Sequence, residues 1–265
     1  MGKEIRVLID NEKCTGCGLC IADCQRHVLE MQNNKAAVIN TRCLKCGHCM
    51  AVCPENAVKL DGYDDEILDM PGEQVFLDEK KLITHLKFRR SVRQYKNTPV
   101  EKEKLEKIIE AGRLTPTASN MQNVRYIVIQ NEIDAIEDEV LDQYKKLIRP
   151  TSLLRRIIKM PFKPSLSRLK RGFLFHKAPA VILVISPSEI NACLAAMNME
   201  LMAETLGLGT VYVGLFTRPA NWNRKLLKSL GIVKGEKIAA CLALGYSNAK
   251  YLRSVPKKNA NIVWR

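Results

Sequence analysis

The chain has no apolar run long enough to cross a membrane. Its longest candidate, residues 178–186, falls far short of the roughly 18 residues that a transmembrane helix needs, so a buried strand is expected there. The first residues, Met-Gly-Lys-Glu, lead into a strand-like stretch without the apolar segment of a signal peptide. These two absences predict a cytoplasmic protein, whose thiols stay reduced.

Arrangements of catalytic side chains are also scarce. No Ser-His-Asp order or pair of carboxylates stands out, and no Gly-x-Gly-x-x-Gly fingerprint for a nicotinamide cofactor is present. The histidines show no ligand spacing: they are His27, His48, His85 and His176. The sequence therefore offers no catalytic side chain, as expected where a bound cofactor supplies the chemistry.

Cysteine, in contrast, is abundant and regularly spaced. Eight of the ten cysteines form two copies of a Cys-x-x-Cys-x-x-Cys-x-x-x-Cys run, offset by 29 residues. In such runs three thiolates hold one [4Fe–4S] cubane and the fourth holds the other cluster. One cluster is therefore expected on Cys14, Cys17, Cys20 and Cys53. The second is expected on Cys43, Cys46, Cys49 and Cys24.

Disulfides and zinc are the alternative uses of these cysteines. Disulfides need an oxidising compartment, and zinc sites usually have cysteine pairs separated by a longer loop. With Gly18 and Gly47 at matching places, residues 1–60 resemble bacterial-type two-cluster ferredoxins, which implies transfer of single electrons at low potential. The remaining Cys193 and Cys241 lie among Ala and Leu and are predicted to be buried, inert thiols.

Acidic and basic residues are unevenly distributed along the chain. Residues 61–80 carry eight acidic residues around Pro71 and Gly72, whereas nearly all of the net charge of +14 lies beyond residue 62. The predicted organisation is a ferredoxin-like domain over 1–62, an acidic linker over 63–84 and a larger domain over 85–265.

The larger domain alternates helical and strand-like patterns. Helices are predicted over 101–112 and 191–206, and strands over 125–130, 180–185, 210–215 and 238–244. An α+β or α/β domain with a central sheet is expected.

Three short motifs lie in this domain. Arg89, Arg90, Ser91 and Arg93 would suit a phosphate group, although runs of this kind are more often solvated charge. The polar loop 115–122 follows a predicted helix and precedes a predicted strand, and an ordinary turn is the alternative interpretation of this motif. Glycines 207, 209 and 214 suit close backbone approach to a flat ligand, or equally helix–sheet packing.

In this order, these segments resemble the nitroreductase family of FMN oxidoreductases over residues 85–265. An Arg-Arg-Ser-x-Arg start, a Pro-x-x-x-Asn-x-Gln loop, Ala178-Pro179, a Gly-Leu-Gly helix end and Gly245-Tyr246 carry the resemblance. It implies a small two-cluster ferredoxin domain followed by a nitroreductase-like α+β domain. It also implies bound FMN at the interface of a C2 homodimer.

The resemblance further implies which residues contact FMN. The phosphate and ribityl chain would be held by Arg89, Arg90, Ser91, Arg93, Arg253 and Lys257. The flavin would be reached from the partner subunit by Pro116, Thr117, Ser119, Asn120 and Gln122. Val213 and Gly214 would offer backbone amides near the reactive N5 edge.

A basic segment over 143–188 has no acidic residue. Its eleven basic residues are Lys145, Lys146, Arg149, Arg155, Arg156, Lys159, Lys163, Arg168, Lys170, Arg171 and Lys177. A solvated face is the favoured interpretation; the alternatives are an anionic substrate, an acidic redox protein such as ferredoxin or flavodoxin, or anionic lipid. Neither nucleic acid nor a membrane surface is the expected partner.

A ferredoxin-like domain joined to a nitroreductase-like domain predicts an iron–sulfur flavoprotein. Such a protein passes electrons from [4Fe–4S] clusters to FMN and on to an electron-poor small acceptor. Nitro compounds, quinones and activated alkenes are the expected classes. One alternative is an electron-transfer module that docks a separate redox protein, and another gives the ferredoxin domain only a structural role. The sequence leaves the donor open between ferredoxin and NAD(P)H.

Overall fold

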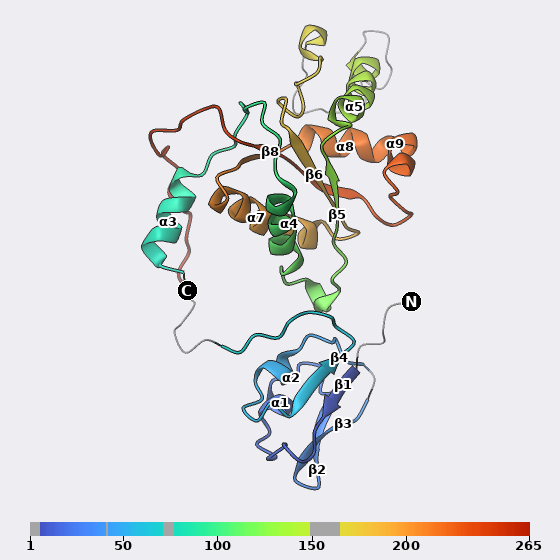
Figure 1. Ribbon diagram of the computed structural model, residues 1–265, viewed down its shortest axis with the longest axis vertical. Coiled ribbons are helices and arrows are strands. Elements are labelled where there is room, and N and C mark those ends of the chain that lie inside the picture. The colour runs from blue at the N-terminus through green and yellow to red at the C-terminus, as the bar shows by residue number, and fades with distance from the viewer. Residues whose placement is uncertain (1–5, 41, 71–76, 149–164) are drawn as a thin grey trace. The chain divides into compact units, whose positions relative to one another are not determined.

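The computed structural model describes residues 6–40, 42–70, 77–148 and 165–265 (Figure 1). The chain forms two compact units. The first contains Met1–Phe76 and Thr117–Met121, and the second contains Leu77–Pro116 and Gln122–Arg265. The domain boundaries drawn from the sequence stay a prediction, and a helix begins at Glu79 inside the expected acidic linker.

The first unit consists of short strands and single-turn helices. In chain order they are β1 (Arg6–Ile9), α1 (Leu19–Ala22), β2 (Leu29–Gln32), β3 (Lys35–Val38), α2 (His48–Ala51) and β4 (Val58–Asp61). β1 pairs antiparallel with β4, and β2 pairs antiparallel with β3. Each two-stranded sheet therefore takes one strand from each half of the unit.

The backbone of this unit repeats at the same 29-residue offset as its cysteines. Positive φ angles occur at Gly16, Gly18 and His27 in the first half, and at Lys45, Gly47 and Asn56 in the second. Gly18 and Gly47 precede α1 and α2 with nearly equal φ angles of 77° and 79°. Glycine adopts this left-handed conformation at little cost, so both cysteine runs can turn into their helices in the same way.

The second unit contains α3 (Glu79–Phe88), α4 (Lys102–Arg113), β5 (Arg125–Ile129), α5 (Ile133–Ile148), β6 (Ala180–Ile185), α7 (Glu189–Thr205), β7 (Gly209–Tyr212), α8 (Gly214–Trp222), α9 (Arg224–Ser229) and β8 (Ile238–Gly245). Its antiparallel sheet has the order β5-β6-β8-β7. An α+β domain with a central sheet is confirmed.

Both faces of this sheet are covered by helices (Figure 1). The strand β6 is wholly buried, and its alternate side chains belong to two separate cores. Val181, Leu183 and Ile185 pack with α5, α8 and α9, whereas Ala180, Ile182 and Val184 pack with α4 and α7. Burial on both faces explains why this segment is a continuous apolar run rather than an alternating one.

Two sequence predictions in this unit are wrong. The strand predicted over 210–215 ends at Tyr212, because α8 begins at Gly214 and takes the last two residues. Cys193 is exposed although Cys241 is buried, since α7 turns Ala192 and Ala195 toward the core and leaves Cys193 outside. Within the described ranges, no helix has the length and apolar composition of a membrane span.

Gly209 opens β7 at a place where another segment passes very close. A Cβ on Gly209 would overlap Val92 Cγ2 and lie 2.7 Å from Val92 Cβ. The stiff β-branched side chain cannot move away easily, so we expect Gly209→Ala to lower the free energy of unfolding by ~1–3 kcal/mol. Thermal unfolding would measure the loss. If steric overlap is the cause, Gly209→Ala combined with Val92→Ala should lose less than the sum of the two single changes.

Candidate functional site

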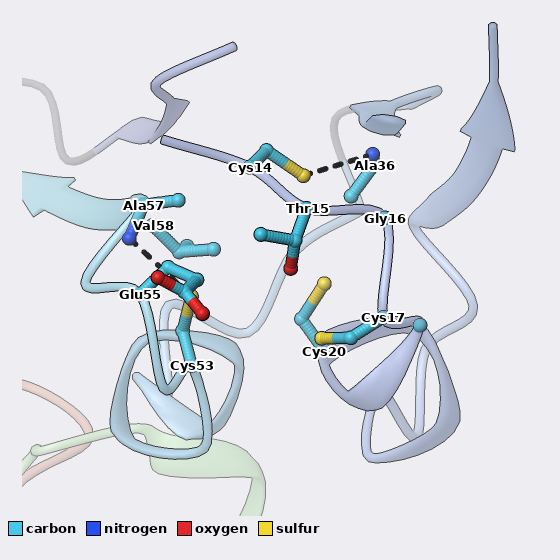
Figure 2. A pocket seen from close by; sticks show the side chains of 11 residues that line it. Cys14, Thr15, Gly16, Cys17, Cys20, Ala36, Cys53, Glu55, Ala57 and Val58 are labelled. Carbon is cyan, nitrogen blue, oxygen red and sulfur yellow. Dashed lines mark hydrogen bonds between the residues drawn. The ribbon is translucent and has the colours of Figure 1, made fainter. Parts of the chain in front are cut away.

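Four cysteines of the first unit surround one cavity. Cys14, Cys17, Cys20 and Cys53 line it (Figure 2). Three come from the first cysteine run and the fourth comes from the end of the second run, which is the combination expected for one cubane. Figure 2 also shows Glu55 beside Cys53 at this cavity. The structure thus brings together one of the two predicted ligand sets, while ligation itself stays a prediction.

Backbone amides point at several of the cysteine sulfurs. The N–H groups of Ala36 and Ala57 donate to Cys14 Sγ and Cys53 Sγ, at 3.5 and 3.3 Å. In the second run, the N–H of Lys45 donates to Cys43 Sγ at 3.3 Å. The amide of Ala36, and then that of Gly16, lower the pKa of Cys14. Such hydrogen bonds stabilise a thiolate and tune the potential of a bound cluster.

For Cys20 and Cys49, burial and neighbouring thiols raise the pKa instead. Burial raises the pKa of Cys20, and the neighbouring Cys14 and Cys17 add to the rise. Burial likewise raises the pKa of Cys49 to about 11, with Cys43 as the next cause. A metal ligand must be a thiolate, so these thiols need the positive charge of bound iron to deprotonate.

The second set, Cys43, Cys46, Cys49 and Cys24, is less completely defined. Cys43, Cys46 and, from the first run, Cys20 all contribute to the raised pKa of Cys49. The assignment of Cys24 to them stays a prediction. In the described part of the chain, no three His, Cys, Asp or Glu side chains gather as a single metal ion would require.

In the second unit, two of the predicted phosphate-binding arginines line a cavity of about 300 Å³. Arg89 and Arg90 follow the last turn of α3, and Glu204, Gly209 and Tyr251 are among the other residues that line the cavity. The hydroxyl of Tyr251 donates to the carbonyl of Ser91 at 3.4 Å, which connects the C-terminal tail to the arginine run. This volume would admit a phosphate with the sugar-like chain attached to it.

Both arginines have unused hydrogen-bonding capacity. Nη2 of Arg90 donates to the carbonyl of Lys87 at 2.7 Å, and its Nη1 donates to the carbonyl of Arg89. The Nε atoms of Arg89 and Arg90 are buried without a hydrogen-bond partner in the described residues. Leaving a buried donor unpaired is costly, and a phosphate has the acceptor oxygens that guanidinium groups prefer. The site therefore fits the phosphate group of a nucleotide cofactor.

Two carboxylates of α7 face the same region. Arg89 Nη1 lies 2.5 Å from Oε1 of the buried Glu200, and His85 Nε2 lies 2.7 Å from Oε2 of Glu204. Burial raises the pKa of Glu204, and the facing His85 partly opposes that rise. The sequence analysis missed Glu200, Glu204 and His85. The available signal was a pair of Glu residues four apart in a helix made mostly of apolar residues.

The polar loop is divided between the two units of the chain. Ser119, Asn120 and Gln122 have positive φ angles of 52°, 51° and 46°. Thr117–Met121 belongs to the first unit, where Asn120 Nδ2 donates to the carbonyls of Leu44 and Lys45 at 3.1 and 2.9 Å. Pro116 and Gln122, on either side, belong to the second unit. The flavin contacts assigned to Pro116, Thr117, Ser119, Asn120 and Gln122 stay predictions.

The remaining predicted residues occupy two settings. The amide of Val213 donates to the carbonyl of Cys241 at 2.8 Å, so Gly214 is the better placed of the two to present its N–H to a ligand. Apart from Gly214, its two chain neighbours and the nearby backbone of α8, no described heavy atom lies within 4 Å of the place where a Cβ of Gly214 would stand. Arg253 and Lys257 are exposed in the C-terminal tail, and Ser91 and Arg93 follow the two arginines of the cavity.

Part of the basic segment is described, and acidic residues of α5 neutralise some of its charge. Arg171 Nη2 lies 2.5 Å from Asp138 Oδ2, and Lys145 Nζ lies 2.8 Å from Asp142 Oδ1. The buried carboxylate of Glu137 accepts hydrogen bonds from the backbone amides of Gly172, Leu174 and Phe175. Arg149, Arg155, Arg156, Lys159 and Lys163 lie outside the described residues.

Comparisons with known proteins agree with this geometry. Residues 86–246 match the Nitroreductase family, and residues 6–64 match the 4Fe-4S dicluster domain. A protein of Archaeoglobus fulgidus with the provisional name NADH dehydrogenase/NAD(P)H nitroreductase is 26% identical over 168 residues, which are 60% of this chain and 80% of that one.

Solved structures show the same fold. An FMN-bound nitroreductase from Bacteroides fragilis superposes with a TM-score of 0.55 at 21% identity, and one from Desulfitobacterium hafniense superposes with 0.55 at 23% identity. Each match covers 71% of this chain and 100% of the other. Because the matched residues 86–246 are more than half of the 265-residue chain, the protein belongs to the nitroreductase family, with a 4Fe-4S dicluster domain preceding its nitroreductase domain.

Proposed function

We propose that this iron–sulfur flavoprotein oxidoreductase transfers electrons from two [4Fe–4S] clusters through FMN to an electron-poor small acceptor. A nitro compound, a quinone or an activated alkene would suit as the acceptor. The observation that carries the proposal is the cavity formed by Cys14, Cys17, Cys20 and Cys53 in a chain that also holds an arginine-lined cavity in a nitroreductase fold. Such a chain has the parts of a converter between single-electron donors and two-electron acceptors.

Each side chain has a defined task in this proposal. The cysteines hold the clusters, and backbone amides such as that of Ala36 stabilise their thiolates. Arg89 and Arg90, which line the cavity, bind the FMN phosphate through their guanidinium groups, and Gly214 presents open backbone to the flavin. FMN, when bound, accepts electrons one or two at a time and delivers them to the acceptor from N5, so no side chain has to be the redox group.

We also propose the assembly and setting that the family resemblance implies. A C2 homodimer with FMN at its interface would allow Pro116, Thr117, Ser119, Asn120 and Gln122 to reach the flavin of the other subunit. A reducing cytoplasm suits cysteines that bind iron–sulfur clusters. A soluble, acidic ferredoxin or flavodoxin is a suitable electron donor, and the name of the Archaeoglobus relative adds NAD(P)H as a second one.

Anaerobic reduction of the purified protein tests the electron path. NADH, NADPH and reduced ferredoxin are offered separately to the wild type and to Cys17→Ser, while optical and EPR spectra follow the flavin and the clusters. We expect reduced ferredoxin to bleach the flavin of the wild type and to do so at least about tenfold more slowly in the variant. Dithionite should reduce the flavin of both proteins, which shows that the variant keeps a working flavin site.

Other outcomes contradict the proposal in distinct ways. Equal flavin reduction in the two proteins would give the ferredoxin domain a structural role only. If NAD(P)H bleaches the flavin before the clusters, electrons leave through the clusters, and the chain is a donor to another protein. That alternative also predicts that a partner protein is reduced far faster than any nitro compound or quinone.

A further inference from the structure

Glu200 is a charged residue in the core of the second unit. It lies on the buried face of α7, one helical turn after Ala196, and only 1% of its surface is exposed. A buried carboxylate destabilises a fold unless cations or hydrogen-bond donors surround it. An apolar residue at this position would pack more favourably beside Ala196 and Ala203. The contacts that compensate the buried charge of Glu200 therefore indicate what the residue does.

Glu200 has one cationic partner, Arg89, and one hydroxyl partner, Thr210. Its Oε1 lies 2.5 Å from Arg89 Nη1 and accepts a weaker hydrogen bond from Thr210 Oγ1 at 3.3 Å. The side chain of Arg89 is 31% exposed, so one edge of its guanidinium meets Glu200 inside the protein while the group also borders the cavity. This single Nη1–Oε1 ion pair anchors one end of the guanidinium and so restricts the directions in which its other N–H groups point.

Arg89, which lines the cavity, has a donor that no described residue accepts from. Its Nε is buried without a hydrogen-bond partner among the described residues, whereas its Nη1 donates to Glu200. Arg90, whose Nε is also unpaired, lines the same cavity. A long arginine side chain would lose rotamer freedom on binding a phosphate, and the pair with Glu200 removes that freedom beforehand.

We infer that Glu200 is a positioning residue that orients Arg89 to bind the phosphate of FMN. This inference rests on the proposed function, since it takes the arginine-lined cavity as the cofactor phosphate site. Glu200 itself does not touch the cofactor. It acts through Arg89, so its effect should be confined to ligands that carry the phosphate.

The test compares FMN with riboflavin, which lacks the phosphate. Dissociation constants of both are measured by flavin fluorescence for the wild type and Glu200→Gln after removal of flavin. Glutamine keeps the size of the side chain but loses the charge that strengthens the bond to Arg89. We expect FMN to bind about tenfold more weakly to the variant and riboflavin to bind as before. Glu236→Gln is the control, because Glu236 pairs with Arg125 at 2.7 Å outside this cavity.

Each other result has a definite meaning. Equal weakening of FMN and riboflavin would show a general structural role and overturn the inference. Tighter FMN binding would also overturn it, since Glu200 would then compete with the phosphate for Arg89. An unchanged FMN-to-riboflavin ratio in Glu200→Gln, with a clear preference for FMN in the wild type, would refute the positioning role alone. A wild type without any preference for FMN would refute the proposed cofactor site.

Discussion

Replacing Cys53 with serine is expected to remove the cluster held by the first cysteine run and to leave the other one in place. Cys53 belongs by sequence to the second run, yet it lines the same cavity as Cys14, Cys17 and Cys20. Serine is a poor ligand for iron, and three thiolates hold a cubane less securely than four. The iron content should fall to about half, and one of two EPR signals of the reduced protein should vanish.

Single-ligand variants provide the comparison. Cys17→Ser should lose the same EPR signal as Cys53→Ser, whereas Cys46→Ser should lose the other one. Cys193→Ser is the matched control, because Cys193 is exposed in the second unit and outside both runs. If Cys53→Ser resembles Cys46→Ser instead, each run holds its own cluster and the exchange of fourth ligands is wrong. Loss of all iron from Cys53→Ser would mean that the unit cannot fold around a single cluster.

The cysteine site was predictable because its information is local and is repeated. The spacing of the runs, with Gly18 and Gly47 at equal places, is enough to predict two similar loops. The structure adds that the backbone follows the same repeat, down to the left-handed residues His27 and Asn56. It also shows that each two-stranded sheet pairs one strand from the first half of the unit with one from the second half, which brings Cys53 to the first run. This pairing is a tertiary property that the cysteine spacing alone cannot reveal.

The ion pair at the arginine-lined cavity could not be predicted from the sequence. Arg89 and Glu200 are 111 residues apart, and nothing local to either residue indicates the other. The helix α7 is apolar nearly all the way round, so its pattern could not tell which face was buried. The same uncertainty misplaced Cys193 in the core. A charged residue inside such a helix could have been flagged, because burial without a partner would cost too much.

Arg89→Ala is expected to give a protein that retains no FMN through purification. If Arg89 binds the phosphate as proposed, the change removes a charge-assisted contact and leaves the phosphate with fewer donors in the cavity. Weakening by about 100-fold or more is expected from the loss of one charged hydrogen-bonding group, on the order of 3 kcal/mol. Flavin content after desalting, followed by titration with added FMN, measures the effect. Arg171→Ala is the matched control, because Arg171 pairs with Asp138 on an exposed part of the same unit.

Stability must be separated from binding in this variant. Arg89→Ala also leaves the buried Glu200 without its cation, which should lower the free energy of unfolding by about 2–4 kcal/mol, discounted because Arg89 is partly exposed. Adding Glu200→Ala removes the stranded charge, so the double variant should regain much of the stability measured by urea unfolding. It should not regain FMN, since the phosphate-binding guanidinium is still missing. A double variant that binds FMN as tightly as the wild type would show that Arg89 supports the fold rather than the cofactor.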